Sequence, residues 1–117
     1  MIYRYTGAAL ALLLLQGCAS DPAPSEQMRL TEQVVEQART VAAGETVAEL
    51  TQAEEKLALA RSAMADEAYR DARIQAEQAE LDARLGEARV LSLRSQAQLV
   101  ELNRQIGRLR EQLGAMP

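Results

Sequence analysis

The chain has 117 residues, of which 48% are hydrophobic, and 13 cations against 17 acids give a formal net charge of −4. This length fits one small domain, and the mildly acidic balance excludes the basic surface that nucleic-acid binding requires. His, Phe and Trp are absent and there is a single cysteine, so histidine catalysis, a core of large aromatic side chains and a disulfide framework are excluded as well.

A short apolar run lies near the amino terminus. Residues 7–15 are apolar and follow the cation Arg4, but a membrane-spanning helix needs roughly 20 such residues. A positive start, a short apolar run and a small residue before a cleavage point are typical of an export signal. Leu15-Gln16-Gly17-Cys18 resembles the lipobox of bacterial lipoproteins. This resemblance implies cleavage between Gly17 and Cys18, diacylglycerol on the Cys18 sulfur and an acyl chain on the new amino terminus.

The alternative is an ordinary signal peptide in which Cys18 is incidental, although an exported chain would then carry a free thiol. Two or three acyl chains would hold the protein at a membrane without a spanning helix. The resemblance also implies the outer membrane, periplasmic face, because Ala19 stands where an aspartate tends to retain lipoproteins at the inner membrane. We therefore expect a signal peptide over 1–17, a lipidated cysteine and proline-containing tether over 18–24, and a helical periplasmic domain over 25–117.

The first two helices are expected at about 26–43 and 47–65. Ser25 is the expected cap of the first, and Gly44-Glu45 separates the two helices. Thr46 and Glu49 have the spacing of a capping box at the start of the second. The apolar faces recur at helical spacing and comprise Leu30, Val34, Ala38 and Val41 in the first helix, and Leu50, Ala53, Leu57, Ala60 and Met64 in the second.

A third helix is expected at about 67–113, after a turn near 64–67 in which Asp66 is the cap. Its first half carries a stripe for close helix packing, made of Tyr69, Ala72, Ala76, Ala79 and Ala83. Its second half carries a bulky seam with spacings of three and four, made of Leu99, Leu102, Ile106, Leu109 and Leu113. This seam either faces a partner or a second copy, or packs against the first helix, and the sequence leaves both possibilities open.

Residues 30–90 resemble a family of short bacterial envelope lipoproteins and domains known only as a domain of unknown function, some of which sit beside OmpA-type domains. The matching positions include Ala48-Glu49-Leu50, Ala53, Leu57, Ala60, Tyr69, Ala72, Ala76, Ala79 and Asp82-Ala83. The resemblance implies a helical hairpin with Tyr69 near its turn, and no activity. The family pattern usually has a proline near position 48 and a glycine before the tyrosine, where this chain has Ala48 and Ala68.

The chain is also similar to small murein lipoproteins, which are lipid-anchored coiled coils. Those that end in lysine attach covalently to peptidoglycan, whereas this chain ends Ala115-Met116-Pro117. Covalent attachment is therefore not expected.

Together these features predict an all-α fold, a helical hairpin or three-helix antiparallel bundle whose long C-terminal helix extends as a coiled-coil-like arm. The acids are read as solvated helix faces, because no pocket is predicted that would shift a carboxyl pKa and no EF-hand loop is present. We expect no enzyme activity, no metal and no cofactor beyond the lipid on Cys18. The expected partners are membrane lipid and either a second copy or an envelope protein, with peptidoglycan close by. The alternative function is a small periplasmic binding or chaperone-like module.

Overall fold

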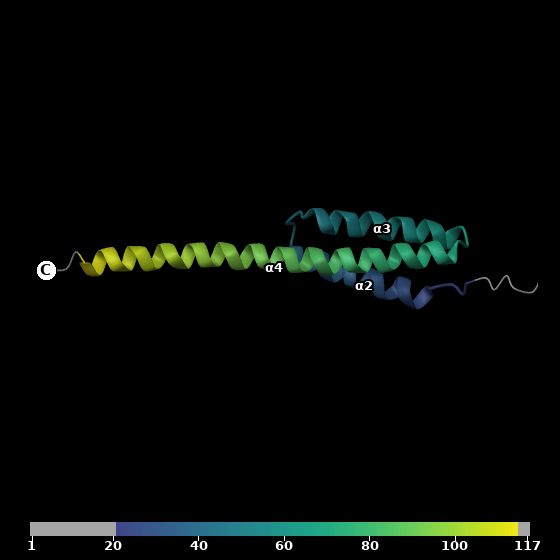
Figure 1. Cartoon of the computed structure of the whole chain (residues 1–117), viewed down its shortest axis with the longest axis horizontal. Coiled ribbons are helices and arrows are strands. Elements are labelled where there is room, and N and C mark those ends of the chain that lie inside the picture. The colour runs from purple at the N-terminus through teal and green to yellow at the C-terminus, as the bar shows by residue number, and fades with distance from the viewer. Residues whose placement is uncertain (1–20, 115–117) are drawn as a thin grey trace, which may run out of the picture.

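The computed structural model describes residues 21–114, which form three helices. They are α2 (Ser25–Ala42), α3 (Ala48–Ala65) and α4 (Tyr69–Gly114). Consecutive helices run in opposite directions, so α2 and α3 pack against the first half of α4 while its second half extends beyond them (Figure 1). This confirms the all-α bundle with a long C-terminal helix. Within the described residues, no helix combines the length and the apolar character needed to cross a membrane.

The core is built from small side chains. Successive spacings of three and four residues give both α3 and the first half of α4 one continuous buried face. On α4 it comprises Ala72, Ala76, Ala79, Ala83, Gly86 and Val90, and on α3 it comprises Leu50, Ala53, Leu57 and Ala60. A Cβ atom added at Gly86 would lie 3.1 Å from the backbone nitrogen of Leu50. The absence of a side chain at Gly86 therefore sets how closely α3 approaches α4.

The buried face of the first helix is rotated by part of a turn from the predicted one, so the prediction is wrong. The buried residues of α2 are Met28, Thr31, Val35, Ala38 and Ala42, so Ala38 alone belongs to both sets. Leu30 is 45% exposed, and Val34 and Val41 are half-buried. The reason is Thr31, which is fully buried and donates a hydrogen bond from its hydroxyl to the carbonyl oxygen of Ala76, 3.1 Å away. A pattern of apolar residues cannot reveal a buried face that includes a polar side chain with a partner.

The predicted N-terminal caps are also wrong. Ser25 is the first residue of α2 rather than its cap, which is Pro24, and α3 is preceded by Val47 rather than Thr46. Neither cap makes a side-chain hydrogen bond. The extended backbone of Val47 (φ −122°, ψ 144°) places the first turn one residue later than a Thr46 cap would require.

The turn between α3 and α4 is closed by backbone atoms. Asp66 ends α3 instead of starting the next helix, and Glu67 adopts a left-handed conformation with φ 57°. The amide of Ala68 bonds to the carbonyl oxygen of Ala63 and that of Glu67 to the carbonyl oxygen of Met64. These are the two hydrogen bonds of a Schellman motif, which commonly has glycine at the left-handed position. The motif moves the start of the last helix from the predicted residue 67 to Tyr69.

Candidate interaction surface

The three-helix part of the molecule ends at Arg94. Val90, one turn earlier, is the last buried residue of α4. The guanidinium of Arg94 donates from Nη2 to the carbonyl oxygen of Ala42 at 3.0 Å and from Nε to Glu45 at 2.7 Å. Arg94 therefore ties the α2–α3 loop to α4 at the level where the two shorter helices end.

Beyond this point, residues 95–114 continue as a single helix, which we call the arm. At a rise of 1.5 Å per residue it is about 30 Å long. Every residue of the arm is exposed except Gly107, which is half-buried. Figure 1 shows the arm leaving the bundle at the end opposite the start of α2.

All five residues of the predicted seam lie on the arm and are exposed. Their exposed fractions range from 44% for Ile106 to 65% for Leu113. The α2 helix does not cover them, because it lies beside the bundle part of α4, where Gln27 contacts Glu80 and Gln37 contacts Glu87. The arrangement in which the seam packs against the first helix is therefore wrong. A row of large apolar side chains left in water marks a surface for interaction.

Except for Arg110, which flanks the seam, the charged groups of the arm lie away from it. Glu101 accepts a hydrogen bond from Gln105 and pairs with Arg104 and Arg108, at 3.9 and 3.2 Å. Such pairs support a solvent-exposed helix by a few tenths of a kcal/mol each. They leave the seam flanked by side chains that carry little charge.

The predicted helix-packing stripe has a different environment. Ala72, Ala76, Ala79 and Ala83 have no exposed surface, because α2 and α3 pack over them. Tyr69, the first residue of α4, is half-buried beside the α3–α4 turn. These residues belong to the interior and its edge, so they offer no surface to a partner.

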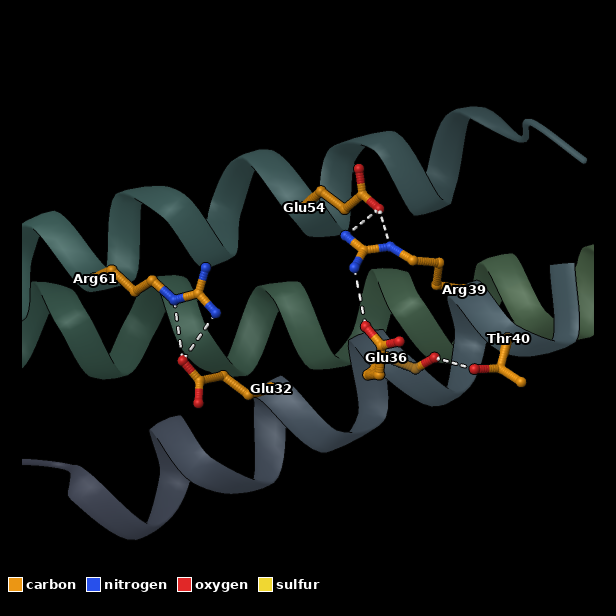
Figure 2. A network of polar contacts seen from close by, with 6 residues as sticks. All are labelled: Glu32, Glu36, Arg39, Thr40, Glu54 and Arg61. Atoms are coloured by element: carbon orange, nitrogen blue, oxygen red, sulfur yellow. Dashed lines mark hydrogen bonds and ion pairs between the residues drawn. The ribbon is translucent and has the colours of Figure 1, made fainter. Parts of the chain in front are cut away.

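Figure 2 shows the ion pairs that join α2 to α3, together with the pair between Arg39 and Glu36 within α2. Arg39 lies between Glu54 and Glu36, at 2.8 and 2.9 Å, and Arg61 pairs with Glu32 at 2.9 Å. The hydrogen bond and charge of Glu54 raise the pKa of Arg39. The side chains of Arg39 and Arg61 are more than half exposed, and exposed pairs of this kind contribute little to stability.

In residues 21–114, no group of three or more carboxylate, His or Cys side chains is placed to hold a metal ion.

The hollows of the described part are small and open. One of about 420 Å³ lies against the start of α2 and is lined mainly by polar residues such as Gln27, Arg73 and Glu77. Another of about 180 Å³ lies at the α2–α3 loop, with Arg39 and Glu45 at its edge. Ligand pockets are mostly apolar and enclosed, whereas both hollows are open to solvent and have charged side chains in their lining.

The predicted lipidation and cleavage residues, Gly17 and Cys18, lie outside the described residues. The chain that follows them approaches the bundle at the beginning of α2, where Arg73 donates to the carbonyl oxygen of Pro22 at 3.4 Å. The described chain therefore begins at one end of the rod and the seam lies at the other, with most of the length of α4 between them (Figure 1). A helix of 46 residues spans about 69 Å.

Comparisons with known proteins agree with this architecture. The profile of the family described as "Domain of unknown function (DUF4398)" matches residues 26–102. The crystal structure of a DUF4398 family protein (PA2901) from Pseudomonas aeruginosa PAO1 is 58% identical, with a TM-score of 0.74, and the match covers 80% of this chain and 97% of that chain. Comparison with curated proteins gives no match. A profile match over more than half of the chain and a relative of this identity show that the chain belongs to the DUF4398 family.

Proposed function

We propose that this protein is a lipid-anchored, non-enzymatic module of the bacterial envelope, held at the periplasmic face of the outer membrane through Cys18. Its role is structural or scaffolding: the bundle is the rigid base and the arm presents the seam to a second copy or to an envelope protein. The observation that carries this proposal is the row of five exposed Leu and Ile side chains on an arm whose other exposed side chains, apart from Val100 and Ala97, are polar.

The lipid anchor is supported by the lipobox-like Leu15-Gln16-Gly17-Cys18 and by the geometry that follows it. Since the chain joins the bundle at the end opposite the arm, a lipid on Cys18 would be remote from the seam. The apolar seam would then remain accessible in the periplasm instead of lying against the membrane.

A small binding or chaperone-like module is the second candidate function. It would need a groove lined by large apolar residues. In the described residues most of the large exposed apolar side chains lie along α4, while the hollows beside α2 are open and have charged side chains in their lining. This distribution favours an interaction module over a ligand carrier.

The anchor is tested by growing cells with radiolabelled palmitate and comparing the natural chain with Cys18→Ser. We expect label on the natural chain, recovery with outer-membrane fractions, and loss of both in the variant. A matched control is Cys18→Ser combined with Ser20→Cys, which restores a thiol two residues from the lipobox position and should remain unlabelled. A natural chain without label, or label on the control, would refute the anchor.

A further inference from the structure

The seam is the end of a longer stripe on the outer face of α4. Counting back from Leu99 in alternating steps of four and three residues reaches Ser95, Ser92, Ala88, Leu85 and Leu81. Leu81 and Leu85 are 67% and 56% exposed, and they lie on the side of α4 opposite the buried alanines. In heptad terms, Leu99, Ile106 and Leu113 are a positions, and Leu102 and Leu109 are d positions. This regularity is the geometry of a surface made for another helix.

The residues that flank the seam are almost all uncharged amides. The e and g positions of a heptad face the partner helix beside the seam and decide which partner is accepted. On the arm these positions are Gln96, Gln98, Asn103, Gln105, Arg110 and Gln112. A helix with the same flanks meets no charge repulsion here, so a second copy of the arm is an acceptable partner.

The bundle part of α4 decides the relative direction of two copies. In a parallel pair, each g position faces the e position five residues later on the other chain. Along the full stripe this would place Arg84 against Arg89 of the other copy, whereas the carboxylate of Asp82 is neutralised by Lys56 of α3. The contact between the two arginines brings like charges together, which is unfavourable. An antiparallel pair that overlaps only along the arms avoids this contact.

We propose that two copies of this chain associate through their arms as an antiparallel coiled coil. Leu102 of one copy packs against Ile106 of the other, and Leu99 of one against Leu109 of the other, so that each layer occurs twice. Leu113 then lies beside Ser95 of the other copy. At the edges, Asn103 meets Asn103 and Gln105 meets Gln105 across the two-fold axis, while Arg110 meets Gln96. The register buries all five seam residues of both copies and contains no like-charge pair.

The dimer has a defined length. In this register the two ends of α4 that carry Tyr69 are separated by 70 helical residues, or about 105 Å. This step rests on the proposed function: with both copies anchored in one leaflet, the dimer would lie along the membrane surface. The amino-terminal ends of the described chains are at its two extremities and the paired arms at its centre.

The test is thiol cross-linking of single-cysteine variants in the full chain, purified from envelopes in mild detergent. Asn103→Cys places two thiols side by side in the antiparallel register. Leu113→Cys places them 18 residues apart, about 27 Å, but directly opposite in a parallel pair. With a short bismaleimide we expect a dimer for Asn103→Cys, none for Leu113→Cys, and loss of the Asn103→Cys dimer when Leu102→Asp and Ile106→Asp are added. A dimer for Leu113→Cys, or monomer for both, overturns the proposal.

Three controls separate the possible failures. The natural chain tests the anchor, because a lipidated Cys18 has no thiol to react, and labelling of the natural chain by a monofunctional maleimide would refute the lipid anchor without touching the pairing. Leu81→Asp, on the outer stripe of the bundle, should leave the Asn103→Cys dimer intact. A cross-linked product with a different protein would refute pairing of copies while leaving the arm as an interaction surface. Retained helical circular dichroism shows that each variant is folded.

Discussion

At the scale of single residues, polar side chains between α2 and α4 contribute specificity that the small apolar core lacks. Gln27 donates from Nε2 to Glu80 at 2.8 Å and to the Thr31 hydroxyl at 3.2 Å, and that hydroxyl in turn bonds to the carbonyl oxygen of Ala76. Glu80 also accepts a hydrogen bond from Arg84. This chain of donors fixes the rotation of α2 against α4.

The Glu80 carboxylate makes stability depend on pH. The hydrogen bond from Gln27, followed by Arg84, lowers the pKa of Glu80 below its usual 4.5. A lowered folded-state pKa contributes stability at neutral pH that is lost as pH falls through that pKa. We expect Glu80→Gln to reduce the free energy of unfolding at pH 7 by about 1 kcal/mol, and this difference to shrink below pH 4.5. Urea unfolding of the natural chain and the variant, at pH 7 and at a pH below 4.5, measures this difference. An equal loss of stability at the two pH values would contradict the role given to the Glu80 carboxylate.

At the scale of the helices, the ends are held by backbone geometry rather than by side-chain caps. The left-handed Glu67 is the clearest case, since a residue with a Cβ is strained by about 1 kcal/mol or more in that conformation. The turn nevertheless forms because both hydrogen bonds of the Schellman motif are made and because α3 packs against α4 along its whole length.

This strain predicts a stabilising substitution. Glu67→Gly should raise the free energy of unfolding by up to about 1 kcal/mol, because glycine adopts positive φ without the Cβ clash. Asp66→Gly is the matched control, since Asp66 has φ −85° and glycine there adds only backbone entropy to the unfolded chain. Thermal unfolding followed by circular dichroism compares the two variants. Equal melting temperatures would show that the turn carries no strain.

At the scale of the whole molecule, α4 divides into two regions of different stability. Up to Val90 it is covered by α2 and α3, whereas residues 95–114 have no buried side chain. Most helical stability in proteins comes from tertiary packing of one face, which the arm lacks in the monomer. The arm therefore gains most of its stability from whatever packs against the seam.

Hydrogen exchange should reveal this division directly. At dilutions where the protein is monomeric, we expect amides of residues 95–114 to exchange at least about 100-fold faster than those of residues 72–90, since covered helices open only with larger unfolding events. Raising the concentration should slow exchange in the arm alone, as pairing buries the seam. Uniform protection along α4 in the monomer would contradict the division.

Sequence patterns alone determined the all-α class, three helices with breaks near residues 44 and 66, and the alanine stripe and Leu/Ile seam of the last helix. These features are periodic over many residues, so the spacing of apolar residues in the sequence is enough to recognise them. The sequence also gave the lipobox-like motif around Cys18, which lies outside the described residues and stays a prediction.

The tertiary structure decided the rest. The buried face of α2 depends on Thr31 finding the carbonyl oxygen of Ala76, a contact 45 residues away. The α3–α4 turn depends on a strained Glu67 that no propensity favours. Whether the seam is covered depends on where α2 lies, and Arg94 holds the α2–α3 loop at the level where the arm begins. Each of these outcomes is a contact between distant parts of the chain, whose free energy no local pattern contains.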